Sequence, residues 1–286
     1  AASIKKRLEK LEKVDKPEEK IKLQVDFNDN SRTGKDVLII RNLNLSYPNK
    51  VLLEKANLEL YYKEKACLIG ANGTGKSTLI NLIMRYYDEY EGEILIDGQN
   101  LKDIDMEYYR NQIGFVQQEP LMFKDTVFNN IAYGAGNVHV EQVLRAADIA
   151  NAHGFISRMP DAYDTLLGER GIGLSGGENQ KVSAARLFAQ DFEIAILDEP
   201  SSALDPIAEY KMYENLIEVT KNKTVIYISH RLSSAVLSDR IFVLGNGTIL
   251  ESGSHSELMA QNGEYSKMFT LQASSYKGES EVSENV

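Results

Sequence analysis

The stretch of this sequence that most restricts its fold is CLIGANGTGKSTLINLI, which begins at residue 67. An apolar run of strand length leads into a glycine-rich turn, and a run with helical spacing follows. Gly70, Gly75, Lys76 and Ser77 satisfy G-x-x-x-x-G-K-[ST] in the strand-to-helix context that this motif requires. The stretch therefore predicts a buried strand that delivers a phosphate-binding loop to the start of a helix.

The residue types of this loop suit phosphate chemistry. Phosphate oxygens need several converging backbone N–H groups, and glycines let the chain wrap closely around them. Lys76 is expected to reach the β and γ phosphates, and the Ser77 hydroxyl to ligate Mg²⁺. A glycine-rich turn that binds nothing is the alternative, which the complete motif disfavours. The predicted phosphate-binding residues are Gly70, Ala71, Asn72, Gly73, Thr74, Gly75, Lys76, Ser77 and Thr78.

A second apolar run, in EIAILDEP, ends in two acidic residues. Asp198 and Glu199 follow Ile194–Leu197 directly, at the carboxyl end of the predicted strand. Ligands of open α/β sheets collect at that end. Asp198 is expected to hold Mg²⁺, and Glu199 to polarise an attacking water. Two acids in a surface turn are the alternative interpretation.

Two further strand ends carry polar side chains that could sense a γ-phosphate. IGFVQQEP supplies Gln117 and Gln118, and TVIYISHR supplies His230. A histidine at the end of a strand is often only a hydrogen-bonded structural residue. Its position after the third apolar strand of the set favours a functional role instead.

Composition limits the class of protein. The 286 residues are 43% hydrophobic and 26% charged, which fits a folded domain. A formal net charge of -10 argues against general nucleic-acid binding. Cys67 is the single cysteine, so no intrachain disulfide can form, and its apolar neighbours predict a buried thiol. The apolar runs are too short for a bilayer span, so the chain as given is expected to be soluble.

Three zones follow one another along the chain. Residues 1–35 are dominated by charge, with an apolar helical spacing that breaks near Pro17, and they predict a short amphipathic helix and a linker. Residues 36–273 alternate β-branched runs with helical patterns, which predicts an α/β domain with a largely parallel sheet. Residues 274–286 are polar and acidic, and we expect them to be disordered.

Six motifs in order, GANGTGKST, VQQEP, LSGGE, ILDEP, SALD and ISH, resemble the ATP-binding cassette (ABC) superfamily over residues 36–273. The resemblance implies a P-loop ATPase core with ATP and Mg²⁺ as cofactors. It also implies an antiparallel β-subdomain and a helical subdomain at about residues 119–190, inserted between the glutamine loop and the acidic strand.

The resemblance assigns roles by position. Tyr47 matches the aromatic residue that stacks on adenine, with a core-packed aromatic as the alternative. Gln118 matches the glutamine that touches Mg²⁺ and responds to transport-domain motion, and His230 matches the switch histidine at the γ-phosphate. Asp205 ends the loop that crosses to a partner cassette, and Glu199 takes the catalytic position. The implied catalytic residues are Glu199, His230 and Gln118, and the implied metal ligands are Ser77, Gln118 and Asp198.

The segment GIGLSGGENQK, residues 171–181, is the family's signature region. Ser175 followed by Glu178 fits a capping box, so we expect a helix from there to about Ala189. A cap alone does not require Gly176 and Gly177, whose bare N–H groups at a helix start form a second anion site. In ABC proteins this loop closes on the γ-phosphate of the opposite subunit. The resemblance therefore implies a head-to-tail dimer in which these residues complete a neighbour's site.

Two branches of the superfamily are suggested. Residues 87–273 resemble the ATPase domain of an ABC exporter, in DTVFNNIAYG and in GERG at residues 168–171. Residues 1–80 resemble the linker and second cassette of ABC-F proteins. We interpret the chain as a mosaic with its changeover at residues 78–86.

Three functional hypotheses follow. The first is an exporter ATPase domain at the inner face of the cell membrane, with its membrane domain supplied outside this chain. The second is a soluble ABC-F type ATPase acting on the ribosome, which the single cassette, the GERG segment and the acidic balance disfavour. The third is a lone cassette that binds ATP and barely turns it over, because nothing raises the local concentration of its partner.

Overall fold

The computed structural model describes residues 36–47, 50–168, 173–201 and 203–283. The side chains of Tyr47, Lys50 and residues 275–283 are outside this description. So are the amphipathic helix predicted within residues 1–35 and residues 169–171 of the GERG segment.

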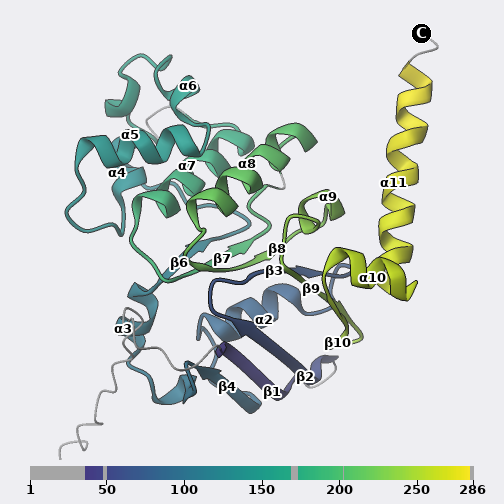
Figure 1. Ribbon diagram of the computed structural model, residues 1–286. Helices are drawn as coiled ribbons and strands as arrows, with labels where there is room; N and C mark the ends of the chain where they lie inside the picture. Colours follow the sequence, from purple (N-terminus) through teal and green to yellow (C-terminus); the bar gives the residue numbers. More distant parts are fainter. Residues whose placement is uncertain (1–35, 48–49, 169–172, 202, 284–286) are drawn as a thin grey trace, which may run out of the picture.

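Strands that are far apart in the sequence form one six-stranded sheet (Figure 1). Its order is β10–β9–β3–β8–β7–β6, with bounds Thr248–Gly253, Arg240–Gly245, Lys65–Ile69, Thr224–Ile228, Ile194–Asp198 and Ile113–Val116. Neighbouring strands are parallel except for β9 and β10. This confirms the predicted largely parallel sheet, and it brings the carboxyl ends of β3, β8, β7 and β6 to one edge.

The central strands β3, β7 and β8 are buried on both faces, which explains their continuous apolar runs. In β3, Ala66 and Leu68 join one hydrophobic core, whereas Cys67 and Ile69 join the core on the opposite face. The buried free thiol predicted for Cys67 is confirmed. Burial raises the pKa of this thiol, so it stays protonated and unreactive.

A second, antiparallel sheet has four strands in the order β2–β1–β4–β5. Their bounds are Lys50–Tyr61, Asp36–Tyr47, Glu91–Ile96 and Gln99–Asn100. Helix α2 (Lys76–Ile83) shares one core with this sheet and with one face of the six-stranded sheet. The short helix η1 (Leu101–Asp103) and α3 (Met106–Asn111) then lead the chain back to β6. The fold is thus the expected α/β architecture with an antiparallel β-subdomain.

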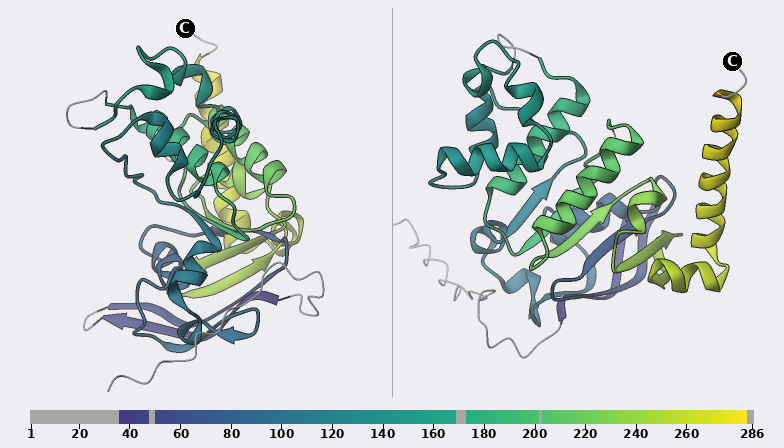
Figure 2. Two further views of the ribbon diagram at one scale, coloured as in Figure 1. Left: turned by 90° about the vertical axis from the view of Figure 1, so that its left-hand side faces the viewer. Right: turned by 45° about the horizontal axis from the view of Figure 1, so that its top comes forward.

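The chain between β6 and β7 is helical and forms a group set apart from both sheets (Figure 2). Its elements are α4 (Val127–Ala132), α5 (Val140–Ile149), α6 (His153–Ile156), η2 (Ala162–Asp164) and α7 (Gly176–Ala189). They surround a hydrophobic core of their own, to which α7 contributes Val182 and Ala185. Leu187 of the same helix packs instead beside the six-stranded sheet. Helix α7 therefore joins the helical group to the sheet.

Helix α8 (Pro206–Val219) covers the face of the six-stranded sheet opposite to α2. It is followed by β8, α9 (Leu232–Ala235), the β9–β10 hairpin and α10 (His255–Gln261). Helix α11 (Glu264–Ser283) packs on the same core as α8 with its first turns, and its later turns project away from the rest of the molecule (Figure 1). Its backbone is helical through most of the segment that we expected to be disordered, and no proline interrupts the sequence after residue 264. Within the described part of the chain, we find no helix with the length and apolar character needed to cross a bilayer.

Candidate nucleotide-binding site

The loop between β3 and α2 requires glycine at two positions. Gly70 and Gly75 have φ values of 151° and 102°, in a region that other residues rarely adopt. A Cβ on Gly70 would lie 2.3 Å from the carbonyl oxygen of Leu244, and one on Gly75 would lie 2.9 Å from that of Leu52. The glycines therefore allow the loop to curl tightly between β9 and β2.

Helix α2 begins without a side-chain cap. Its N-cap residue is Gly75, so no side chain accepts from the first N–H groups of the helix. The Lys76 ammonium folds back over the loop and donates to the carbonyl oxygens of Gly70 and Ala71 at 2.7 and 3.0 Å. Burial lowers the pKa of Lys76, against the opposing pull of the Glu199 and Asp198 carboxylates. The loop thus places a buried cation and uncapped N–H groups together.

The acidic end of β7 meets the start of α2. Asp198 is the last residue of the strand and only 8% exposed. The Ser77 hydroxyl donates to Asp198 Oδ1 at 3.3 Å. Burial raises the pKa of Asp198, while the Ser77 hydrogen bond opposes that shift. One hydroxyl and one carboxylate from distant parts of the sequence therefore lie side by side.

Glu199 is the meeting point of three strand ends. Its Oε2 accepts from Gln118 Nε2 at 2.8 Å, and its Oε1 lies 2.5 Å from His230 Nε2. Gln118 follows β6 and His230 follows β8, so three adjacent strands supply the three side chains. Glu199 has a φ of 47°, which is unusual for a residue other than glycine. Strained backbone of this kind gathers at functional sites.

These groups surround a cavity of about 460 Å³. Its lining consists of Leu52, Asn72, Gly73, Gly75, Lys76, Ser77, Thr78, Gln118, Glu199 and His230. Among the other predicted residues of this region, Gly70 and Ala71 hold the lysine, Asp198 holds Ser77, and the Thr74 hydroxyl donates to Ala71 O at 2.9 Å. The structure therefore brings these predicted residues together around one polar cavity.

The signature residues lie elsewhere. Ser175 accepts from the Glu178 N–H, and the Glu178 carboxylate accepts from the Ser175 N–H at 2.9 Å. This confirms the predicted capping box and the helix to Ala189. Ser175, Gly176, Gly177 and Glu178 are not among the described residues that line the cavity.

Two more predicted residues are separate from the cavity. Asp205 caps helix α8, because its Oδ1 accepts from the Ile207 and Ala208 N–H groups at 3.0 and 2.9 Å. Tyr47 ends β1, and the position of its ring is outside the described part of the structure.

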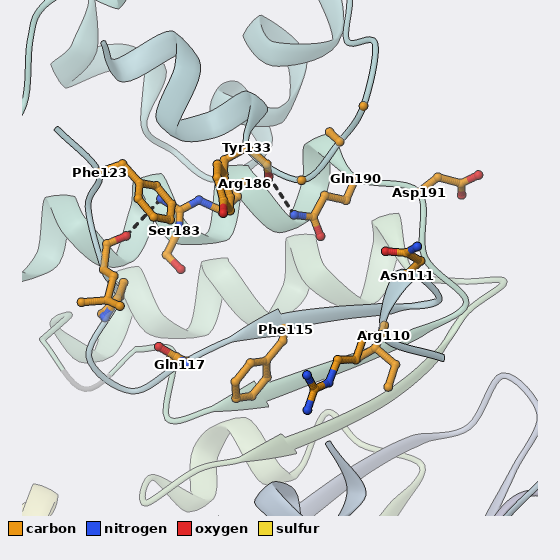
Figure 3. Close-up of a pocket in the computed structure, with 16 residues that line it drawn as sticks. Arg110, Asn111, Phe115, Gln117, Phe123, Tyr133, Ser183, Arg186, Gln190 and Asp191 are labelled. Atoms are coloured by element: carbon orange, nitrogen blue, oxygen red, sulfur yellow. Dashed lines mark hydrogen bonds between the residues drawn. The ribbon is translucent and has the colours of Figure 1, made fainter. Parts of the chain in front are cut away.

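A second cavity, of about 570 Å³, lies where β6 meets the helical group (Figure 3). Gln117 lines it, although the neighbouring Gln118 belongs to the first cavity. Arg186 spans it from α7, donating to Leu121 O at 3.1 Å with its guanidinium 5.1 Å from the Phe123 ring. This cavity could not be predicted from the sequence, because only the fold joins β6 to the helices around it.

The sequence analysis also missed an ion pair beside His230. Arg231 Nη1 lies 2.6 Å from Glu209 Oε2, and Glu209 is 3% exposed. Glu209 stands on α8, one turn after the capping Asp205. A charged residue four positions after SALD was the only signal in the sequence, and it does not reveal its partner.

The fold and the cavity define a P-loop nucleotide-binding protein, with uncapped helix N–H groups, a loop lysine and acidic residues at an adjacent strand end. A family model described as "ABC transporter" matches residues 53–202, which is more than half of the chain. The chain belongs to the ABC transporter family and corresponds to its ATP-binding domain.

Two curated relatives are a lipid flippase and a putative multidrug export protein. The chain is 44% identical over 246 residues to an ATP-dependent lipid A-core flippase of Syntrophus aciditrophicus (strain SB), covering 86% of this chain and 41% of the flippase. It is 46% identical over 221 residues to a putative multidrug export ATP-binding/permease protein of Staphylococcus aureus (strain NCTC 8325 / PS 47), covering 77% of this chain and 38% of that protein. The chain thus spans about two fifths of the length of these relatives.

The fold agrees. A solved structure of a bacterial Atm1-family ABC exporter with ATP bound superposes with a TM-score of 0.81 at 34% identity, covering 95% of this chain and 46% of that one. The flippase match leaves 40 residues uncovered, so it includes at least half of residues 1–80. The comparisons support the exporter branch along the chain and give no support to the ABC-F interpretation or to a mosaic.

Proposed function

We propose that this chain is the part of an ABC exporter that binds and hydrolyses ATP. The observation that carries the proposal is the convergence of Gln118 and His230 on Glu199, beside the phosphate-binding loop. Water attack on a γ-phosphate needs a base that orients the water and donors that stabilise the developing charge. Carboxylate, amide and imidazole supply these groups from three adjacent strand ends.

The phosphate-binding role rests on the loop itself. The first N–H groups of α2 have no side-chain cap, and among the described residues the buried Lys76 donates to two carbonyl oxygens of its own loop. An anion in the cavity would pair with that ammonium and with the helix dipole. The backbone at Gly70, Gly73 and Gly75 can approach a phosphate closely, because these three residues have no Cβ. Tyr47 would stack on the adenine from the end of β1.

Mg²⁺ fits the donor set at this site. Ser77, Asp198 and Gln118 offer hydroxyl, carboxylate and amide oxygens, which are the hard ligands that this ion prefers. The contact between Ser77 and Asp198 already brings two of them together. When bound, the ion would supply charge neutralisation at the phosphate oxygens.

Glu199 would act as the base for the attacking water. Its carboxylate is 12% exposed and held by Gln118 and His230, so it is oriented before any nucleotide arrives. His230 would turn its imidazole to the γ-phosphate, and Gln118 would report on the state of the second cavity through Gln117. Both contacts to Glu199 would loosen as the phosphate enters.

The second half of each site would come from another copy of the chain. Ser175, Gly176 and Gly177 present a capped helix start that lines no part of the chain's own cavity. Asp205 caps α8 nearby and would cross to the same partner. We therefore propose a head-to-tail dimer in which Ser175–Glu178 of one copy face the phosphates held by the other.

A membrane domain is the second proposed partner. The 570 Å³ cavity is open to solvent beside Leu121 and Tyr133, which are 68% and 56% exposed. Apolar side chains exposed around a hollow are typical of protein interaction sites. Joined to such a domain, residues 36–273 would form the nucleotide-binding domain at the inner face of the cell membrane, with residues 119–190 as its helical subdomain.

The proposal is tested with Glu199→Gln, because this variant should bind ATP and fail to hydrolyse it. We expect its mass in solution to double when ATP and Mg²⁺ are added, and to return to that of a monomer when they are removed. A monomer under both conditions, together with a hydrolysis rate of the unmodified chain that is linear in protein concentration, would contradict the dimer.

A further inference from the structure

Gln272 of helix α11 makes two hydrogen bonds to the segment that carries His230. Its Oε1 accepts from the Leu232 N–H at 2.6 Å, and its Nε2 donates to the His230 carbonyl at 3.0 Å. One amide therefore holds the backbone on both sides of Arg231. The two contacts join positions 42 and 40 residues apart in the sequence.

The backbone at this point needs such a partner. Leu232 is the first residue of α9, whose N-cap residue Arg231 provides no side-chain hydrogen bond to the helix. The first N–H of the helix would otherwise lack an acceptor among the described residues. Gln272 thus caps α9 from a different helix.

Helix α11 presents Gln272 on the face that packs against the protein. Tyr265 is fully buried, and Met268 and Phe269 pack on the same hydrophobic core. Gln272 follows at the spacing of three and seven residues that keeps side chains on one face of a helix. Buried Tyr265 and half-buried Phe269 therefore set the position from which Gln272 reaches the loop.

The start of α11 is fixed as well. The Glu251 carboxylate of β10 accepts from the Glu264 and Tyr265 N–H groups at 2.5 and 3.1 Å. A Cβ on Gly263 would lie 2.0 Å from that carboxylate, so the turn into α11 is closely packed. The helix is held at its first turn and again at Gln272, which makes the stretch between them a rigid support.

The opposite side of the loop is tied to the interior of the domain. Ser229 Oγ accepts from the Arg231 N–H at 3.0 Å, and Ser234 Oγ donates to Arg231 O at 2.7 Å. The Arg231 guanidinium meets the buried Glu209 of α8. These contacts hold the serines and the arginine in place. They do not involve the His230 carbonyl, which accepts from Gln272.

We propose that Gln272 is a positioning residue for His230, through which α11 sets the place of the imidazole relative to Glu199. The proposal rests on the proposed function, because His230 acts on ATP only within it. Gln272 touches neither the cavity nor the reacting atoms, and it acts through the backbone of the histidine. A misplacement of about 1 Å in a catalytic group can lower a rate by up to about 100-fold.

The first experiment needs no nucleotide. The full chain holds four histidines, so labelling their rings with ¹³C gives a spectrum in which the signal missing from His230→Ala identifies His230. We expect Gln272→Ala to move or broaden that signal. Ser274→Ala is the matched control, because its hydroxyl donates to Leu271 O within α11 itself. An unchanged His230 signal in Gln272→Ala would overturn the proposal, whatever the chain's activity.

The second experiment measures ATP hydrolysis by the same variants. We expect Gln272→Ala to lower kcat about tenfold with KM for ATP little changed, and Ser274→Ala to have no effect. In a His230→Ala background, Gln272→Ala should lower kcat no further, because the two residues act as one unit. Independent losses in the double variant, with equal melting temperatures, would indicate a merely structural role and reject the proposal. An unmodified chain that does not hydrolyse ATP would instead reject the proposed function, while the histidine spectrum still decides the role of Gln272.

Discussion

Helices α2 and α7 both start after glycine-rich turns, yet the two starts are built differently. The N-cap of α2 is Gly75, which leaves the first N–H groups uncapped beside a cavity that this chain lines by itself. The N-cap of α7 is Ser175, which closes a complete capping box with Glu178. The two helices also pack on opposite sides of the six-stranded sheet.

The two helix starts differ in what they can bind within a single chain. At the start of α2, the first N–H groups have no side-chain acceptor, so a bound anion would stabilise them. At the start of α7, the capping box already stabilises the helix without an anion. A capping box needs no bound anion, so the glycines after Ser175 require another reason. In our account that reason is a second copy of the chain, whose bound phosphates reach Gly176 and Gly177.

The largest expected effect comes from breaking the chemistry on the α2 side. Glu199→Gln should lower the hydrolysis rate about 10²- to 10⁴-fold while ATP still binds, because the amide cannot take a proton from water. Hydrolysis and equilibrium ATP binding are measured on the same sample. Glu218→Gln is the control, since Glu218 is 68% exposed and its ion pair within the described part of the chain is with Lys221, at 2.6 Å. Equal losses of hydrolysis rate in Glu199→Gln and Glu218→Gln would show that Glu199 is not the catalytic base.

The next effect is on affinity. Lys76→Met should weaken ATP binding at least about tenfold, because a hydrogen bond to a charged group contributes about 1.5–3 kcal/mol. The fold without nucleotide should be retained or stabilised, since burial lowers the pKa of this lysine and so disfavours its charged form. Calorimetric titration measures the affinity for ATP, and thermal unfolding measures the stability without nucleotide. Unchanged affinity would show that the α2 start binds no phosphate.

Much of this site could be predicted from the sequence, because its residues stand directly after apolar strands. Parallel strands bring such ends together, so Glu199, Gln118 and His230 had to meet once the sheet formed. Gln272 could not be found in this way, since its contact depends on the angle at which α11 leaves α10. The second cavity depends in the same manner on how the helical group sits against β6.

Two helices, α7 and α10, begin with the same kind of capping box, so one can serve as a control for the other. Ser254 and Glu257 form the same box at α10 that Ser175 and Glu178 form at α7. Ser175→Ala and Ser254→Ala should each lower the free energy of unfolding by about 1 kcal/mol. Only Ser175→Ala should also lower the hydrolysis rate, while leaving ATP affinity of the single chain unchanged. Identical hydrolysis rates for the two variants would show that Ser175 only caps α7 and has no role in hydrolysis.

The smallest expected effect is a pH dependence on the α2 side. Burial raises the native pKa of Asp198 above its ordinary 3.8, so the native state holds this proton longer than the unfolded chain does. This carboxyl therefore lowers the free energy of unfolding as pH rises from 3.8 through the native pKa. Asp198→Asn should remove that part of the slope in urea titrations at a series of pH values. If Asp198→Asn leaves the slope unchanged, the native pKa of Asp198 is not raised by its burial.

If each chain supplies one half of two different ATP sites, two variants that are disabled in different halves should restore activity to each other. Lys76→Ala disables the α2 half and leaves the signature intact, whereas Ser175→Arg blocks the signature and leaves the α2 half intact. Each variant alone should be inactive. Mixed in equal amounts, they should hydrolyse ATP, because each mixed dimer then contains one complete site. A mixture no more active than the separate variants would contradict the account.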